Sequence, residues 1–102
     1  MHPIVEEKRD AILELCRRHR LMRLDLFGSA ATDEFDPASS DIDFLVELED
    51  LEPAAYSEAY FSLLEDLEAL LGRSVDLVVE SAVTNPYFRE SIERTRTRLY
   101  AA

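Results

Sequence analysis

The sequence has no tryptophan, one cysteine, two histidines and no long apolar run. Because Cys16 is alone, an intrachain disulfide is excluded, and a reducing compartment fits. Its place in an apolar helical pattern predicts a buried packing role. No stretch approaches the roughly 20 apolar residues of a membrane span, and the charged N-terminal segment lacks the apolar core of a signal peptide. We therefore expect a soluble, cytoplasmic protein with no targeting segment and no membrane partner.

Basic residues are nearly absent from the middle of the chain. Residues 24–80 hold sixteen acidic side chains against the single Arg73, a local charge of −15 in a chain whose net charge is −11. Such a surface would repel a phosphate backbone, so we do not expect duplex nucleic acid as a partner. Most of these acids fit a solubilising surface. A cluster that binds a divalent cation would belong to the same set.

The order of the patterns predicts an α/β fold, with residues 1–102 as a single domain and neither repeats nor an internal linker. Three strands, with helices on one side, would bury the core. Ser29 is expected to cap a short helix over "AATDE", and "FDPASS" is expected to be a loop. The segment "RTRLYA" could be an edge strand or a tail. The expected helices cover Pro3 to about Arg20, Pro53–Leu71 and Asn85-Pro86 to about Arg94; the expected strands cover Arg23–Phe27, Asp41–Leu48 and Ser74–Val79.

The clearest strand, "DIDFLVEL", carries two carboxylates on one face. Alternate residues of a strand point to the same side, so Asp41 and Asp43 share a face with Leu45 and Glu47. Their Cα atoms would lie about 6.5–7 Å apart. Two unpaired carboxylates repel each other, so a cation is expected between them. The opposite face is apolar and is made by Ile42, Phe44, Val46 and Leu48.

Oxygen-only ligation favours Mg²⁺, or Mn²⁺, over zinc. Asp76 adds a third acid on the strand "SVDLVV", and three carboxylates would converge if the two strands are neighbours. An EF-hand is excluded, because Val46 stands where its loop requires glycine. The arrangement suits two-metal phosphoryl or nucleotidyl transfer.

A Gly-Ser pair stands where a strand ends, at Gly28 and Ser29. Glycine lets a backbone approach a phosphate closely, and a helix that begins there directs free N–H groups at the anion. Each feature alone has an ordinary interpretation: a turn for Gly-Ser, a solvated face for Asp-x-Asp and a surface acid for Asp76. Their combination in this order favours the catalytic interpretation.

These residues resemble a known family. "LFGS", "SDIDFLVE" and "VDLV" are similar to the signature of the minimal nucleotidyltransferases, small members of the DNA polymerase β-like superfamily, over Leu24 to Val79. The closing "NPYFRESIERT" also resembles their last helix. The resemblance implies a nucleotidyltransferase fold with a small mixed β-sheet packed against helices. It also implies Mg²⁺ as cofactor and ATP or another NTP as substrate.

The resemblance also implies roles for individual residues. Asp41 and Asp43 would bind the metal. Asp76 would be the third catalytic carboxylate, helping to bind metal and accepting the proton of the attacking hydroxyl. Gly28, Ser29 and Ser40 would bind the nucleotide. Many such proteins are antitoxins of HEPN-type ribonuclease toxins, which they neutralise by transferring AMP to a toxin tyrosine, often together with direct binding.

One departure from the family pattern concerns the triphosphate. Arginines and a glycine are usual after Gly-Ser, but Ala30, Thr32 and Asp33 stand in their place. Each lost charge-assisted hydrogen bond would cost about 1.5–3 kcal/mol. Either a partner subunit or cations from the two basic ends compensate, or turnover is weak. The candidate cations are Arg17, Arg18, Arg20, Arg23, Arg89, Arg94, Arg96 and Arg98.

The pattern and the family resemblance together lead to three hypotheses. The first is a metal-dependent nucleotidyltransferase that modifies a helical HEPN-type toxin encoded nearby. The second is a binding module that has lost transfer activity and neutralises its partner by complex formation. The third is the detached catalytic half of a larger transferase that acts on a small hydroxyl compound such as an aminoglycoside. The amphipathic first helix could also form a homodimer or partner surface.

Overall fold

A computed structural model describes residues 1–32 and 41–102 of the chain. The expected loop over "FDPASS", the nucleotide-binding candidate Ser40 and the departure at Asp33 lie outside the described residues. The elements are, in order, α1 (Pro3–Glu7), α2 (Arg9–Arg18), β1 (Leu21–Phe27), the 3-10 turn η1 (Gly28–Ala31), β2 (Ile42–Leu48), α3 (Pro53–Leu71), β3 (Val75–Val79), the 3-10 turn η2 (Glu80–Ala82), α4 (Pro86–Thr95) and β4 (Thr97–Ala101).

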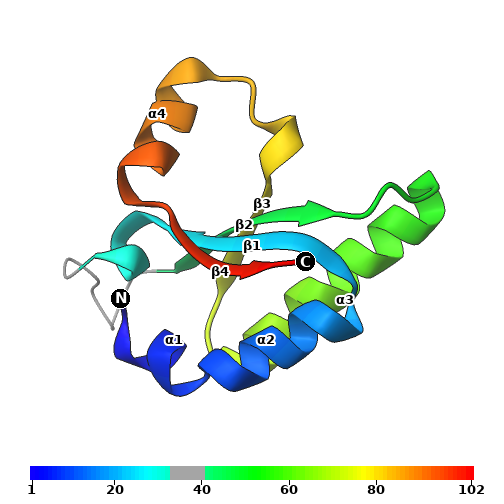
Figure 1. The fold of residues 1–102 in the computed structure, drawn as a ribbon, viewed down its shortest axis with the longest axis horizontal. Helices are drawn as coiled ribbons and strands as arrows, with labels where there is room; N and C mark the ends of the chain where they lie inside the picture. Colours follow the sequence, from blue (N-terminus) through cyan, green and yellow to red (C-terminus); the bar gives the residue numbers. More distant parts are fainter. Residues whose placement is uncertain (33–40) are drawn as a thin grey trace.

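The sheet is mixed, with the strand order β3-β2-β1-β4 (Figure 1). β2 and β3 run parallel, whereas β1 pairs antiparallel with β2 on one side and with β4 on the other. The α/β prediction with a small mixed sheet is therefore confirmed. The segment "RTRLYA" forms an edge strand, so the described sheet has one strand more than the three expected.

Helices cover both faces of the sheet, which corrects the expectation of helices on one side. α1, α2 and α3 lie beneath it in Figure 1, over a core that includes Ile12, Phe44 and Leu67. α4 lies on the opposite face, where Ile92 packs against Phe27 and Leu45. The reason is visible in β2: Leu45 is apolar on the face that carries the acids, and it needs a cover.

Two helices match their predicted limits closely. α3 runs from Pro53 to Leu71 and ends at Gly72, whose φ of 66° is the left-handed conformation that closes a helix. α4 begins at Pro86, and the Asn85 side chain accepts hydrogen bonds from the N–H groups of Tyr87 and Phe88. None of the helices in the described ranges combines the length and hydropathy that crossing a membrane requires.

The first predicted helix is divided at Lys8. Lys8 still donates to the carbonyl of Ile4, and its own carbonyl accepts from Ile12, so the division is a kink rather than an unpaired end. Beyond the kink Cys16 is fully buried, as predicted, and burial raises the pKa of its thiol to about 12. The helical segment ends at Arg18, because Arg20 turns the chain with a φ of 57° and β1 starts at Leu21, two residues earlier than expected.

Candidate active site

The acidic residues of two neighbouring strands meet on the face of the sheet that α4 partly covers. β2 and β3 pair in register, so that Asp43 lies opposite Asp76. On its other side Asp43 lies opposite Phe27, the last residue of β1, which leads directly into Gly28. The strand order therefore places Asp43 in the middle, with Asp76 on one side and the Gly-Ser turn on the other.

The electrostatics of Asp43 show that negative charge accumulates here. Burial, followed by the charges of Asp76 and Asp41, raises the pKa of Asp43 from an ordinary 3.8 to about 6. Two like-charged neighbours and partial desolvation destabilise the ionised form of a carboxylate. A bound cation would stabilise that form.

The three candidate ligands, Asp41, Asp43 and Asp76, are all carboxylates, which are the donors that a hard divalent cation prefers. The described residues, however, contain no group of three acid, histidine or cysteine side chains already arranged around one point. Asp41 precedes the first residue of β2 and its side chain is exposed. Its charge reaches Asp43, but only Asp43 and Asp76 are direct neighbours in the sheet. Movement of the exposed Asp41 and Asp76 side chains would be needed to complete a metal site.

Gly28 is fitted closely against Asp43. Its φ is 71°, and a Cβ added there would lie 2.5 Å from Asp43 Oδ2. The Gly28 N–H donates to the hydroxyl of Thr95, at the end of α4, across 2.8 Å. η1 begins at Gly28 without a side-chain cap, so the prediction that Ser29 caps a short helix is wrong. The positive φ of Gly28 turns the chain one residue earlier than expected.

Gly28→Ala is expected to damage both stability and the site. The left-handed conformation alone costs a non-glycine residue about 1–2 kcal/mol, and the methyl group would also displace the Asp43 carboxylate. Gly72→Ala is the matched control, because Gly72 has a similar φ of 66° but nothing lies within 4 Å of an added Cβ. Urea denaturation should show a larger loss for the Gly28 variant. Equal losses in the free energy of unfolding would mean that the contact with Asp43 adds nothing to the destabilisation.

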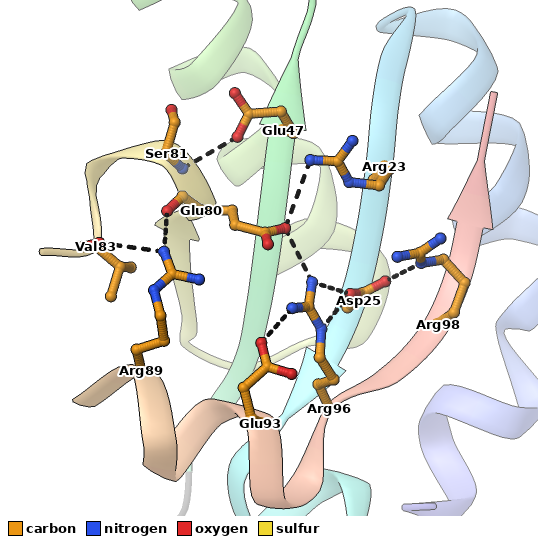
Figure 2. A network of polar contacts seen from close by, with 10 residues as sticks. All are labelled: Arg23, Asp25, Glu47, Glu80, Ser81, Val83, Arg89, Glu93, Arg96 and Arg98. Carbon is orange, nitrogen blue, oxygen red and sulfur yellow. Dashed lines mark hydrogen bonds and ion pairs between the residues drawn. The ribbon is translucent and has the colours of Figure 1, made fainter. Parts of the chain in front are cut away.

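A network of arginines and acids lies on the same face of the sheet, towards β4 (Figure 2). Its centre is Asp25, which is 2% exposed and is contacted by Arg96 at 2.6 Å and by Arg98 at 2.6 Å. Arg96 also bonds Glu80 at 2.9 Å and contacts Glu93. Hydrogen bonding to Arg96 lowers the pKa of Glu80, and the pKa of Arg96 is raised, chiefly by its hydrogen bond to Glu80.

Several of the arginines that were candidates for phosphate binding belong to this network. Most of the candidate arginines contact carboxylates or backbone carbonyls of this chain. Arg96, which is 20% exposed and bonded to the buried Asp25, would have to be released to bind a phosphate, whereas an exposed pair such as Arg17 with Glu14 opens at little cost. The bound arginines are Arg17, Arg20, Arg23, Arg89, Arg94, Arg96 and Arg98.

Sequence reasoning missed two parts of the site: the hydrogen bond from the Gly28 N–H to the Thr95 hydroxyl and the role of Asp25. Both depend on contacts over about seventy residues of chain, between β1 and the end of α4. A signal was present in "RLDLF", where an acid stands on the strand between two leucines that become buried. A buried acid predicts a cationic partner, but the pattern does not tell which arginine supplies it.

Comparison with known sequences places most of the chain in one family. A sequence model described as "Nucleotidyltransferase domain" matches residues 8–99. A candidate protein adenylyltransferase of Methanocaldococcus jannaschii is 39% identical over 90 residues, which is 80% of this chain and 88% of that protein.

Comparison with solved structures agrees. A candidate minimal nucleotidyltransferase matches with a TM-score of 0.67 and 32% identity, over 95% of each chain. A toxin–antitoxin complex with AMP-PNP matches with a TM-score of 0.71 and 25% identity, over 92% of this chain and 73% of that one. A Shewanella oneidensis complex of a tri-AMPylated HEPN toxin with an MNT antitoxin has the same fold, with a TM-score of 0.66 and 23% identity over 95% of this chain and 72% of that one.

Proposed function

Because this chain belongs to the nucleotidyltransferase domain family, we propose that it transfers AMP from ATP to a tyrosine hydroxyl of a HEPN-type toxin encoded nearby and thereby acts as an antitoxin. The chain is a nucleotidyltransferase of the minimal type. The observation that carries the proposal is the placement of Asp43 between Asp76 and the Gly-Ser turn. The candidate protein adenylyltransferase among its relatives supports AMP as the transferred group. The AMPylated HEPN toxin in a structural neighbour supports a HEPN-type toxin as the acceptor.

The transfer would proceed by in-line displacement at the α-phosphorus of ATP. The acceptor oxygen forms a bond to this phosphorus, the bond from the phosphorus to the β-phosphate oxygen breaks, and pyrophosphate leaves. The proton of the hydroxyl passes to the carboxylate of Asp76, which is exposed and therefore accessible. Asp41 and Asp43 would hold Mg²⁺, with Asp76 as a further ligand. When bound, Mg²⁺ polarises the hydroxyl and neutralises the departing pyrophosphate.

The nucleotide would lie on the Gly28 side of Asp43. In that position the backbone of Gly28 and Ser29 faces the triphosphate, and Ser40 is the third nucleotide-binding candidate. The Gly28 N–H is engaged by Thr95, so it reaches a phosphate only if that bond opens. Nucleotide binding would therefore be coupled to the position of the α4 end.

The binding module remains the second candidate function, and two observations favour it. Most arginines of the basic ends contact carboxylates or carbonyls of this chain, and Ala30 and Thr32 provide no replacement for the usual cations. A protein with these features could neutralise its partner by forming a complex while transferring AMP slowly or not at all.

Intact-mass spectrometry of the neighbouring-gene product, after incubation with this chain, ATP and Mg²⁺, separates the two functions. We expect an AMP-sized increase in the mass of the partner, and we expect it to disappear with Asp43→Asn. An unmodified partner that nevertheless forms a stable complex with both wild type and Asp43→Asn would contradict transfer and support the binding module.

A further inference from the structure

An apolar groove lies along the outer edge of β3, on the side of the acids that faces away from Gly28. Its volume is about 360 Å³, which is within the usual range of ligand pockets. The strand β3 and the helix α3 form one wall, and the segment from η2 to the start of α4 forms the other. The residues that line it are Tyr60, Leu77, Val78, Val79, Ala82, Val83, Thr84, Asn85 and Phe88.

The groove adjoins the candidate active site on both walls. Leu77 follows Asp76 directly, and its carbonyl accepts a hydrogen bond from the Tyr60 hydroxyl. The charge of Asp76, together with burial as the larger cause, raises the pKa of Tyr60, so the two side chains are within electrostatic reach. On the opposite wall, the ring of Phe88 packs edge-to-face on Phe27, with ring centroids 6.1 Å apart, immediately before Gly28.

Hydrogen bonds stabilise the groove wall that is formed by the segment from η2 to the start of α4. Arg89 donates to the carbonyls of Glu80 and Val83, and the carboxylate of Glu47 accepts from the N–H of Ser81 (Figure 2). These bonds hold the η2 segment in place before any ligand arrives, and a preformed groove loses less entropy on binding than a mobile one.

One aromatic side chain of the groove lining and one next to the lining are exposed. Phe88, which lines the groove, is 40% exposed. Phe61 lies outside the lining but packs on the lining residue Tyr60, with ring centroids 5.1 Å apart, and is 58% exposed. Aromatic residues are enriched at protein interfaces, where they provide large contact areas. Asp76 directly precedes the lining residue Leu77, and the carboxylate of Glu47 accepts from the N–H of Ser81, which directly precedes the lining residue Ala82, so an acidic ligand would be repelled and a basic one attracted.

We propose that this groove is the docking site for an extended, neutral-to-basic segment of the acceptor protein, which places its tyrosine hydroxyl beside Asp76. The inference rests on the proposed function. The topology gives the reason for this side: the nucleotide is proposed at Gly28, on the β1 side of Asp43, so the hydroxyl must approach from the β3 side for in-line attack. An apolar neighbour of the tyrosine would insert between Tyr60 and Phe88.

Two fluorescein-labelled peptides test the proposal, acetyl-Val-Lys-Tyr-Lys-Val-amide and the same peptide with glutamate in place of both lysines. Fluorescence anisotropy with the full chain should show at least tenfold tighter binding of the lysine peptide. Ala82→Trp should weaken this binding at least tenfold, because Ala82 lines the groove and is exposed, so the indole fills the groove without disturbing the core. Thr84→Trp gives a second obstruction. Ala69→Trp, on an exposed part of α3 outside the groove, is the control and should change nothing.

The outcomes separate this inference from the proposed function. Peptide binding that Ala82→Trp and Thr84→Trp leave intact, or no binding of either peptide to the wild type, would overturn the inference. Weaker binding of MgATP to Ala82→Trp, measured by calorimetry, would also overturn it, because the groove would then hold the nucleoside. Groove-dependent binding without AMP transfer to the peptide or to the partner would support the docking site and contradict the proposed function.

Discussion

Arg96→Ala is expected to lower the free energy of unfolding by about 3–5 kcal/mol, the usual loss when one partner of a buried ion pair is removed. Asp25 is 2% exposed and accepts two hydrogen bonds from Arg96, at 2.9 and 2.6 Å. Without this guanidinium, Asp25 keeps only Arg98 among its described ion-pair partners, and Glu80 loses its closest cation. Chemical denaturation at pH 7 measures the effect.

Arg94→Ala is the matched control, because Arg94 is an exposed arginine in the last turn of α4, two residues before Arg96. It contacts Glu90 at 2.9 Å, with side-chain exposures of 71% and 62%. Such a surface pair contributes only about 0.3–0.5 kcal/mol. Adding Asp25→Asn to the Arg96 variant should recover part of the loss, because the uncompensated buried charge is removed. Equal effects of Arg94→Ala and Arg96→Ala on the free energy of unfolding would show that the network does not stabilise the fold.

The network also predicts how stability changes with pH. Since hydrogen bonding to Arg96 lowers the pKa of Glu80 in the folded state, the stability from this pair is complete above the ordinary value of 4.5. It is lost as the pH falls through the lowered pKa of the folded protein. Arg96→Ala should therefore reduce the loss of stability that the wild type shows on acidification below pH 4.5.

Asp43→Asn is expected to reduce transfer severely and at the same time to stabilise the metal-free protein. The loss of activity should be roughly 10²–10³-fold, as when one preorganised electrostatic contact is removed from an active site. The gain in stability should be about 1–3 kcal/mol, because a pKa raised from 3.8 to about 6 means that the folded protein disfavours the ionised carboxylate. Denaturation at pH 8 in EDTA, together with a transfer assay in Mg²⁺, measures both.

The pH dependence of this gain provides its control. The folded pKa of Asp43 is raised, so the destabilisation of the wild type is absent below about pH 4, grows between about pH 4 and 6, and is complete above about pH 6. The advantage of Asp43→Asn should accordingly shrink at pH 4. Asp50→Asn, at an exposed carboxyl just after β2, should change neither stability nor activity. A destabilised Asp43→Asn variant at pH 8 would contradict the account of the site.

Much of the fold could be predicted from local patterns. The alternation in "DIDFLVEL" gives the two faces of β2, and Pro53 and Gly72 delimit α3. The expectation that Asp43 and Asp76 meet required only that two apolar strands be neighbours, and the parallel pairing of β2 with β3 brings these two residues side by side. These features follow from residues close together in the sequence or from simple periodicity.

The remaining features depend on contacts between distant segments. The placement of α4 on the second face follows from Ile92 meeting Leu45, and the bond of Gly28 to Thr95 joins residues 67 positions apart. No local pattern specifies such pairs. The occupied arginines are a related case: the sequence shows the charge of Arg96, but only the fold shows that Asp25 and Glu80 hold it.

A titration with Mn²⁺, followed by electron paramagnetic resonance in the presence and absence of ATP, shows whether the acids beside Gly28 bind a divalent cation together with a nucleotide. We expect the wild type together with ATP to bind Mn²⁺ more tightly than ATP alone binds it. The affinity of Asp43→Asn together with ATP should be at least about tenfold lower than that of the wild type. Equal binding by wild type and Asp43→Asn, or no binding beyond that of ATP itself, would contradict a metal site at these acids.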